Sequence, residues 1–102
     1  MTIHSKNKGN RFELEIVQLL KDNGYDAVSS RSESKNLDDK GIDIVTNAPF
    51  NIQCKHVERM SQPVHKLLAS MPFDKTPVVL HKRNNKGVVV CMRLEDFKDL
   101  LL

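Results

Sequence analysis

The sequence has no tryptophan, only two cysteines and no long apolar run. A helix that crosses a bilayer needs roughly 18–20 apolar residues in a row, and no segment approaches that length. The first residues contain no apolar stretch of the secretory-signal type, so we expect a cytoplasmic protein. Cys54 and Cys91 form no C-x-x-C pair, and we expect both to be free, buried thiols.

Further absences limit the chemistry. The four histidines lack a metal-binding spacing such as H-x-x-x-H, which argues against a structural zinc site. The sequence contains no Ser-His-Asp or Cys-His arrangement and no glycine-rich phosphate loop. Its 102 residues are 39% hydrophobic and 28% charged, which is typical of one small globular domain. We expect this domain over residues 10–102, after a basic arm over residues 1–9.

Positive charge is concentrated in two segments of the chain. Residues 1–12 contain three bases and no acid, and residues 53–93 contain eight bases and two acids. This local excess suits a polyanion such as nucleic acid, although a solvated basic surface would have the same composition. Aromatic residues make up only 5% of the chain, which does not favour extensive stacking on single-stranded bases.

Hydropathy patterns predict an α/β fold, a mixed central sheet flanked by helices in the order α-β-β-β-α-β-β-α. The polar segment 29–40 is expected to be a loop. We expect Ser61 to cap the second helix, the last two strands to be buried and the leucines of the last helix to face inward. The predicted helices cover residues 10–23, 61–71 and 94–101, and the predicted strands cover residues 25–30, 42–46, 50–57, 77–81 and 87–92.

Several polar residues break these local hydropathy patterns. Glu13 falls inside the apolar arc of the first helix, and Asp43 lies within a predicted strand, where aspartate is disfavoured. Lys55 shares its strand face with Gln53, while His56 points to the opposite face and is expected to be structural. Polar misfits that can converge in space indicate a functional site.

The strand register determines whether these residues meet. A three-residue hairpin loop would pair Thr46 with Phe50 and therefore place Asp43 opposite Gln53. Two carboxylates and the amide oxygen of Gln53 are hard oxygen donors of the kind that Mg²⁺ takes while keeping several waters. Such a metal could assist phosphodiester hydrolysis, with Lys55 stabilising the developing charge on phosphorus.

The order of these motifs resembles the PD-(D/E)xK nuclease superfamily, and more closely the archaeal-type (Hjc-like) Holliday junction resolvases. Those proteins have a Lys-Gly segment leading into a helix with a glutamate, an Arg-Ser loop after the first strand, a strand aspartate and an E-x-K strand. The resemblance covers most of the chain. The matching residues here are Lys8-Gly9, Glu13, Arg31-Ser32, Asp43 and Gln53-x-Lys55.

The resemblance implies a restriction-endonuclease-like core and a homodimeric, Mg²⁺-dependent endonuclease of DNA recombination and repair, in which Mn²⁺ can substitute. Its substrate would be branched double-stranded DNA, and a twofold dimer would supply the two cuts that a four-way junction needs. It further implies that Glu13, Asp43 and Gln53 hold the metal and are catalytic together with Lys55. The DNA-binding residues carried over or drawn from the basic segments are Lys6, Lys8, Arg11, Arg31, Ser32, Ser34 and Arg59.

The sequence departs from the family pattern at two places, and simpler interpretations stay open. Gln53 replaces the usual glutamate, and the segment from Arg31 to Asp43 is longer than is typical. Glu13 could be an edge carboxylate that turns to water, Asp43 a turn residue, and Gln53 and Lys55 the solvent face of an edge strand. The alternative functions are a restriction or repair nuclease acting on ordinary duplex, and a catalytically silent DNA-binding module with the nuclease fold.

Overall fold

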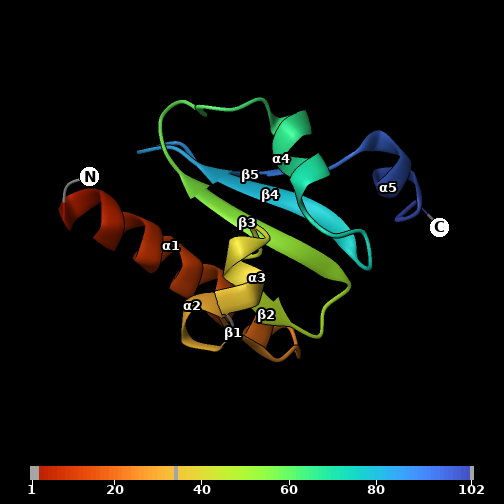
Figure 1. Cartoon of the computed structure of the whole chain (residues 1–102), viewed down its shortest axis with the longest axis horizontal. Coiled ribbons are helices and arrows are strands. Elements are labelled where there is room, and N and C mark those ends of the chain that lie inside the picture. Colours follow the sequence, from red (N-terminus) through yellow and green to blue (C-terminus); the bar gives the residue numbers. More distant parts are fainter. Residues whose placement is uncertain (1–2, 34, 102) are drawn as a thin grey trace.

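The computed structural model describes residues 3–33 and 35–101, with side-chain environments for residues 8–32 and 36–101. Within these residues, the strands are β1 (Ala27–Ser29), β2 (Ile44–Thr46), β3 (Phe50–His56), β4 (Thr76–Lys82) and β5 (Val88–Cys91). They form one sheet in chain order (Figure 1), in which β3 and β4 are parallel and the other neighbours are antiparallel. The predicted α/β class with a mixed sheet is therefore confirmed.

The first helix, α1 (Ile3–Asp22), is longer than its predicted range. It begins at Ile3, so residues 3–9, which the charge pattern marks as a separate basic arm, continue the helix instead. Gly24 ends it at a φ of 91°, a conformation that favours glycine, and the Tyr25 N–H donates to the Leu20 carbonyl at 3.0 Å. None of the described helices is long and apolar enough to cross a membrane.

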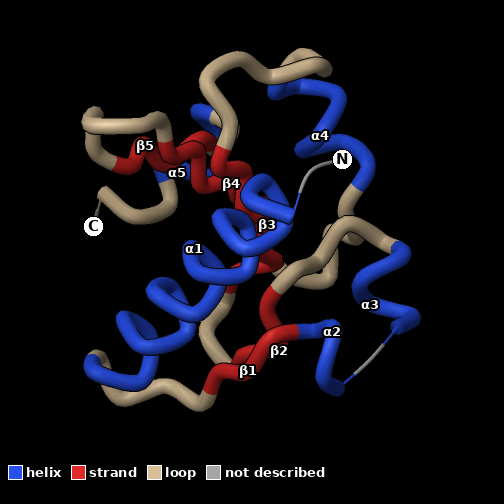
Figure 2. Tube along the Cα trace, turned by 90° about the vertical axis from the view of Figure 1, so that its left-hand side faces the viewer, coloured by secondary structure: helices blue, strands red, loops and turns tan. Residues whose placement is uncertain are grey.

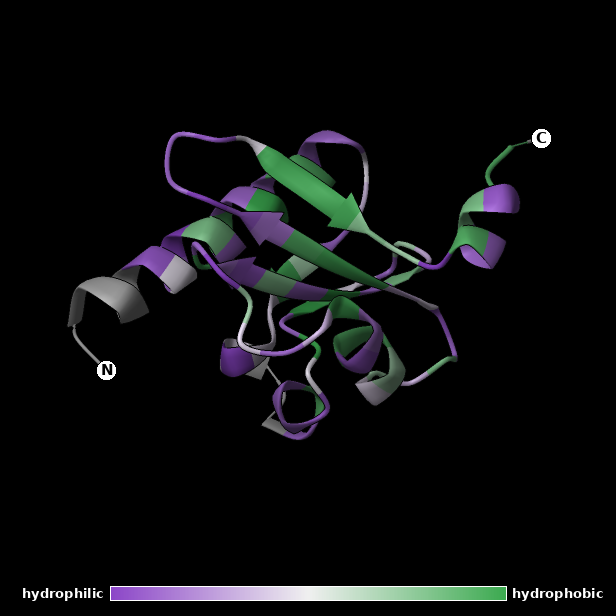
Figure 3. Cartoon of the chain, turned by 90° about the horizontal axis from the view of Figure 1, so that it is seen from above, coloured by the Kyte–Doolittle hydropathy of each residue, from purple (hydrophilic) through white to green (hydrophobic). Residues whose placement is uncertain are grey.

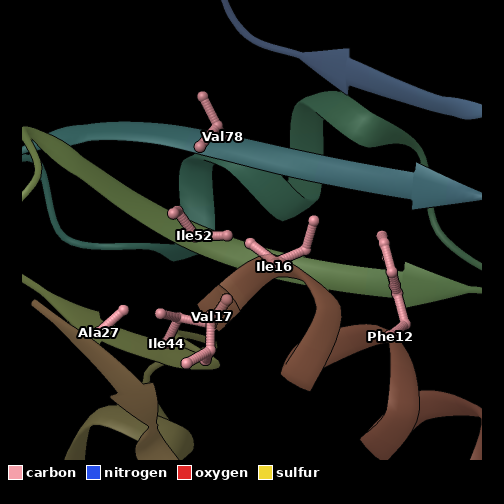
Figure 4. Close-up of a cluster of buried hydrophobic side chains, with 7 residues drawn as sticks. All are labelled: Phe12, Ile16, Val17, Ala27, Ile44, Ile52 and Val78. Carbon is pink, nitrogen blue, oxygen red and sulfur yellow. The ribbon is translucent and has the colours of Figure 1, made fainter. Parts of the chain in front are cut away.

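One face of the sheet is covered by α1, which lies across β1, β2 and β3 (Figure 2). Phe12, Ile16 and Val17 are the buried residues of this helix, and the period of three to four places them on one stripe. Figure 4 shows them packed against the sheet. Their partners in the buried cluster are Ala27, Ile44, Ile52 and Val78.

The opposite face is covered by α4 (Val64–Ser70), which connects the parallel strands β3 and β4. Leu67, Leu68 and Met71 bury against Val79 in a second apolar cluster. The predicted helix is confirmed but its cap is not, because Pro63 and not Ser61 occupies the N-cap position and gives no side-chain hydrogen bond. Two apolar clusters, one on each face, therefore hold the sheet between α1 and α4.

The polar segment expected as a loop contains two one-turn helices, α2 (Ser30–Glu33) and α3 (Lys35–Asp39). Helices of four and five residues are too short to show a hydrophobic period, which is why the sequence pattern missed them. Tertiary contacts position them instead. The Ser30 N–H donates to the Asp43 carbonyl at 2.9 Å, and the Ile42 N–H donates to the Leu37 carbonyl at 3.0 Å.

The C-terminal part differs most from its prediction. Strand β5 is an edge strand, and its three valines are exposed rather than buried. Helix α5 (Leu94–Lys98) buries none of its residues, so the expected inward orientation is wrong. Figure 3 shows β5 as a strongly hydrophobic edge with α5 standing away from the sheet. The exposed large hydrophobic residues of this part are Val88, Val89, Val90, Leu94, Phe97, Leu100 and Leu101.

Candidate active site

Asp43 lies directly before β2 and is hydrogen-bonded to two residues of β3. Its backbone N–H donates to the Ile52 carbonyl, and its carboxylate Oδ2 accepts from the Cys54 N–H, both at 2.8 Å. These two bonds reach the residues on either side of Gln53. The pairing of Ile44 with Ile52 is the register that the hairpin arithmetic predicts, so this prediction is confirmed. Asp43 itself precedes the strand, and its side chain takes the place of a ladder acceptor.

Gln53 packs against the turn that precedes Asp43. A Cβ built at Gly41 would lie 3.2 Å from the Gln53 Nε2, and Gly41 has a φ of 81°, so both space and backbone conformation favour glycine there. The amide oxygen Oε1 of Gln53 is buried and has no hydrogen-bond partner among the described residues. Buried polar atoms are nearly always paired, so this oxygen marks a place for an additional partner.

Glu13 reaches the same end of the sheet from α1. Its side chain is 13% exposed, and its Oε1 accepts hydrogen bonds from Arg31 Nη2 at 2.8 Å and from Ser29 Oγ at 3.2 Å. The carboxylate therefore faces β1 and α2, and it does not turn to water as the simpler interpretation proposed. Because an ionised carboxylate is costly to bury alone, the Arg31 guanidinium offsets part of its desolvation.

The pKa of Asp43 depends on the charges of Glu13, Asp38 and Lys55. The pKa of Asp43 is raised from 3.8 to about 6, chiefly by burial and also by the nearby carboxylates of Glu13 and Asp38, while the Cys54 N–H and the Lys55 ammonium oppose the rise. Burial, together with the negative charges of Asp43 and Glu13, also raises the pKa of the Cys54 thiol, which stays neutral. A cation placed among these carboxylates would stabilise the charged form of Asp43 and so oppose the effects of both its burial and the repulsion from Glu13 and Asp38.

Lys55 and its neighbour His56 point to opposite faces of β3. Lys55 is half-buried on the α4 side and borders a hollow that Arg59 and Ser61 also line. The imidazole of His56 lies edge-on to the Phe12 ring, with ring centroids 5.9 Å apart. His56 therefore packs against α1, and Lys55 is the basic group of β3 that faces the Gln53 side of the sheet.

The donor set fits a hard divalent cation. Among the described residues, no group of three or more histidine, cysteine, aspartate or glutamate side chains is arranged to hold a metal. The candidate oxygen donors are instead the carboxylates of Glu13 and Asp43, which interact electrostatically, and the unpaired amide oxygen of Gln53 on the strand beside Asp43. Mg²⁺ binds such a small set of protein oxygens and completes its shell with water. By the chemistry of these donors alone, Mg²⁺ fits better than a metal that needs a full protein cage.

The residues predicted to bind DNA have different environments. Arg11 is exposed on α1, and Arg59 is exposed after β3. Arg31 is engaged with Glu13, while the Ser32 hydroxyl donates to the Ser29 carbonyl at 2.8 Å. Lys8 is half-buried, and its carbonyl oxygen lies 3.4 Å from the Nδ1 of His56. The side chains of Lys6 and Ser34 lie outside the described residues.

Two site residues were missed by sequence reasoning. Asp38 on α3 raises the pKa of Asp43, and its Oδ1 accepts a long hydrogen bond of 3.5 Å from the Ser30 hydroxyl. Ser29 on β1 donates to Glu13. Asp38 stands in a polar segment with other charges and had no apolar surroundings to mark it. Its proximity to Asp43 depends on the fold of α3, which no local pattern reveals.

By sequence, no known protein family and no curated protein matches the chain. By structure, it is similar to Hjc, a Holliday junction resolvase from the archaeal hyperthermophile Archaeoglobus fulgidus, with a TM-score of 0.54. The likeness covers 80% of this chain and 73% of the resolvase chain, at 22% sequence identity. This similarity confirms the nuclease-like fold, and the chemistry has to be argued from the residues themselves.

Proposed function

We propose that the chain is a Mg²⁺-dependent endonuclease that hydrolyses phosphodiester bonds in branched DNA, as a Holliday junction resolvase does. The observation that carries the proposal is the buried Asp43 carboxylate, on which the charges of Glu13 and Lys55 act, together with the unpaired buried oxygen of Gln53 on the adjacent strand. The fold shared with a Holliday junction resolvase supports it, because the site lies on a scaffold that is used for this chemistry in that protein.

Each residue has a defined task in this proposal. Glu13, Asp43 and Gln53 hold the cation, which when bound polarises a phosphate oxygen and lowers the pKa of a bound water. The Lys55 ammonium stabilises the negative charge that develops on the phosphate oxygens in the transition state. The amide of Gln53 contributes an oxygen without a charge, so the site carries one negative charge less than a glutamate would give it. We therefore expect weaker cation binding than an all-carboxylate set would show.

Contacts to the DNA backbone come from the basic residues around the site. Arg11 and Arg59 are exposed and free to meet phosphates, and Arg31 lies at the edge of the site. Contacts to phosphates fix orientation and carry no base information, so recognition depends on DNA shape. The residues assigned to this task are Lys6, Lys8, Arg11, Arg31, Ser32, Ser34 and Arg59.

We also propose that the protein acts as a homodimer, because one chain offers one site and a four-way junction needs two cuts. The apolar residues on β5 and beyond α5 support this proposal. Val90 is 62% exposed, Leu94 71% and Leu101 65%. Several exposed large apolar residues in one part of the chain are typical of an interaction site, and an uncovered edge strand favours pairing with another chain.

Cleavage of a synthetic four-way junction in Mg²⁺ tests the activity. We expect symmetric nicks that Asp43→Asn and Lys55→Ala each reduce by at least 100-fold, since each removes a group that acts on the reacting phosphate. Asp39→Asn is the matched control, because Asp39 is an exposed carboxylate on the same short helix as Asp38. Cleavage unaffected by Asp43→Asn and Lys55→Ala would rule out this site. Equal cutting of linear duplex would favour the restriction or repair nuclease.

Gln53 is the observation that favours a second candidate, a DNA-binding module without catalysis. The proposed ligand set has only two carboxylates, because Gln53 is uncharged. Whether the protein binds a metal at all therefore distinguishes the nuclease from the DNA-binding module. Isothermal titration with Mg²⁺ or Mn²⁺ separates them, since an intact site binds metal and Asp43→Asn weakens that binding. A protein that binds junction DNA but takes up no metal, even with DNA present, would be the silent module.

A further inference from the structure

The ion pair between Arg31 and Glu13 places a positive charge on a proposed metal ligand. Arg31 Nη2 lies 2.8 Å from Glu13 Oε1, and the Ser29 hydroxyl donates to the same oxygen at 3.2 Å. Glu13 Oε2 makes no hydrogen bond with any residue in the described part of the chain. One oxygen of the carboxylate is thus already occupied by two donors, one of which is a positively charged guanidinium.

A divalent cation and the Arg31 guanidinium would compete for the Glu13 carboxylate. Both are attracted by the negative charge of the carboxylate, and each repels the other at short range. While Arg31 stays on Glu13, it offsets part of the negative charge that Glu13, Asp38 and Asp43 concentrate here. Once Arg31 leaves, one more negative charge is uncompensated, and the affinity of the site for a cation rises.

Arg31 is able to leave. Its side chain is 40% exposed, and in this pair one guanidinium nitrogen meets one carboxylate oxygen, so the bidentate geometry that makes such pairs strong is not used. Ion pairs with an exposed partner are weak in general. A phosphate diester offers two non-bridging oxygens, which the planar guanidinium can contact with two nitrogens at once. A backbone phosphate next to α2 would therefore be a strong competitor for Arg31.

We propose that Arg31 is a latch that couples DNA binding to cation binding. In the DNA-free protein it holds Glu13, and a DNA phosphate that captures Arg31 releases Glu13 to the cation. This inference rests on the proposed function and adds an order to it, since the metal site becomes complete when the substrate is in place. By reciprocity, the cation also strengthens DNA binding by the same factor.

Cation affinity of the DNA-free protein tests the latch without using activity. Mn²⁺ binding is followed by the electron paramagnetic resonance signal of free Mn²⁺, for the wild type, Arg31→Ala and Arg31→Gln. We expect both variants to bind Mn²⁺ about two- to fivefold more tightly, the factor that an ion pair of this exposure corresponds to. Lys98→Ala, which removes a positive charge from exposed α5, is the control and leaves the affinity unchanged.

Junction affinity with and without Mn²⁺ gives the second measurement. Fluorescence anisotropy is used in a Lys55→Ala background, so that cleavage does not consume the DNA. We expect Mn²⁺ to tighten junction binding, and Arg31→Ala to reduce that gain. Equal or weaker Mn²⁺ affinity in both Arg31 variants would overturn the latch while leaving the proposed metal site intact. Absence of Mn²⁺ binding in every protein, with or without DNA, would overturn the proposed function itself.

Discussion

The two ends of the sheet differ in which side chains are buried and which are exposed. At the β1–β3 end, charged and amide side chains are half-buried, as Glu13, Asp43 and Gln53 show. At the β5–α5 end, valines, leucines and a phenylalanine are exposed to solvent. Each arrangement costs free energy in an isolated chain, since one buries charge and the other leaves apolar surface in water. The contrast agrees with our proposals, which assign a cation and phosphate to the first end and a second copy of the chain to the other.

The largest expected effect comes from truncating one buried phenylalanine, on α1, and one exposed phenylalanine, on α5. Phe12 is 1% exposed in the α1 cluster and Phe97 is 46% exposed on α5. Phe12→Ala is expected to lower the free energy of unfolding by about 3–5 kcal/mol. Phe97→Ala is expected to change it by about 0.5 kcal/mol or less, measured by urea unfolding of dilute protein. A large loss in Phe97→Ala under those conditions would show that α5 packs on its own chain.

Asp43 provides the next largest effect, through pH. Its pKa of about 6 in the folded protein is above the ordinary 3.8, so the folded state binds the proton more tightly than the unfolded state. The metal-free protein is therefore expected to gain stability as the pH falls from 7 toward 4, in contrast to a paired carboxylate. The gain is about 1–3 kcal/mol, as the size of the shift implies.

Asp43→Asn sharpens this test because it removes the titrating group and keeps an oxygen for the Cys54 N–H. We expect the metal-free variant to be more stable than the wild type at pH 7.5, yet unable to bind Mg²⁺ tightly. Thermal unfolding across pH 4–8 measures the difference, with Asp39→Asn as the control. If the free energy of unfolding of the wild type fell between pH 6 and 4 by as much as it is expected to rise, the result would contradict the burial of Asp43.

Gly41 gives a smaller effect, at the contact that positions Gln53. Gly41→Ala places a Cβ 3.2 Å from the Gln53 Nε2 and forces alanine to a φ of 81°. We expect a loss of about 1–2 kcal/mol in the free energy of unfolding, together with weaker cation binding. Gly87→Ala is the matched control, because a Cβ there meets nothing within 4 Å and the backbone is not left-handed. Equal effects of the two substitutions would show that Gly41 does not support the site.

The smallest effect on folding is expected at β5. Val90→Lys puts a charge on the exposed edge and is expected to change monomer stability by about 0.5 kcal/mol or less. It should nevertheless weaken self-association at least tenfold, since a lysine is costly in an apolar interface. Light scattering after size-exclusion chromatography measures the mass. Ala69→Lys, which adds the same charge on exposed α4, is the control, and a wild type that stays monomeric at high concentration would refute the dimer.

Local sequence patterns predicted the strand register at the candidate site but not the contacts that surround it. Alternating hydropathy and the short hairpin predicted the register that pairs Ile44 with Ile52 and places Asp43 beside Gln53. The partners of Glu13 were not predictable, because Ser29 and Arg31 are distant in sequence and belong to a segment without a period. Asp38 was missed for the same reason, since its effect on Asp43 arises through space alone.

The sequence by itself determined the strands, the main helices and the strand register, since these follow from hydrophobic period and turn length over a few residues. Only the tertiary structure decided which apolar residues are covered. The valines of β5 have the composition of a buried strand, but no element of the described chain packs over them. It also decided that Glu13 meets Arg31, because pairing between distant segments depends on how α1 crosses the sheet. Burial and ion pairing are properties of neighbours in space, and local pattern carries little information about them.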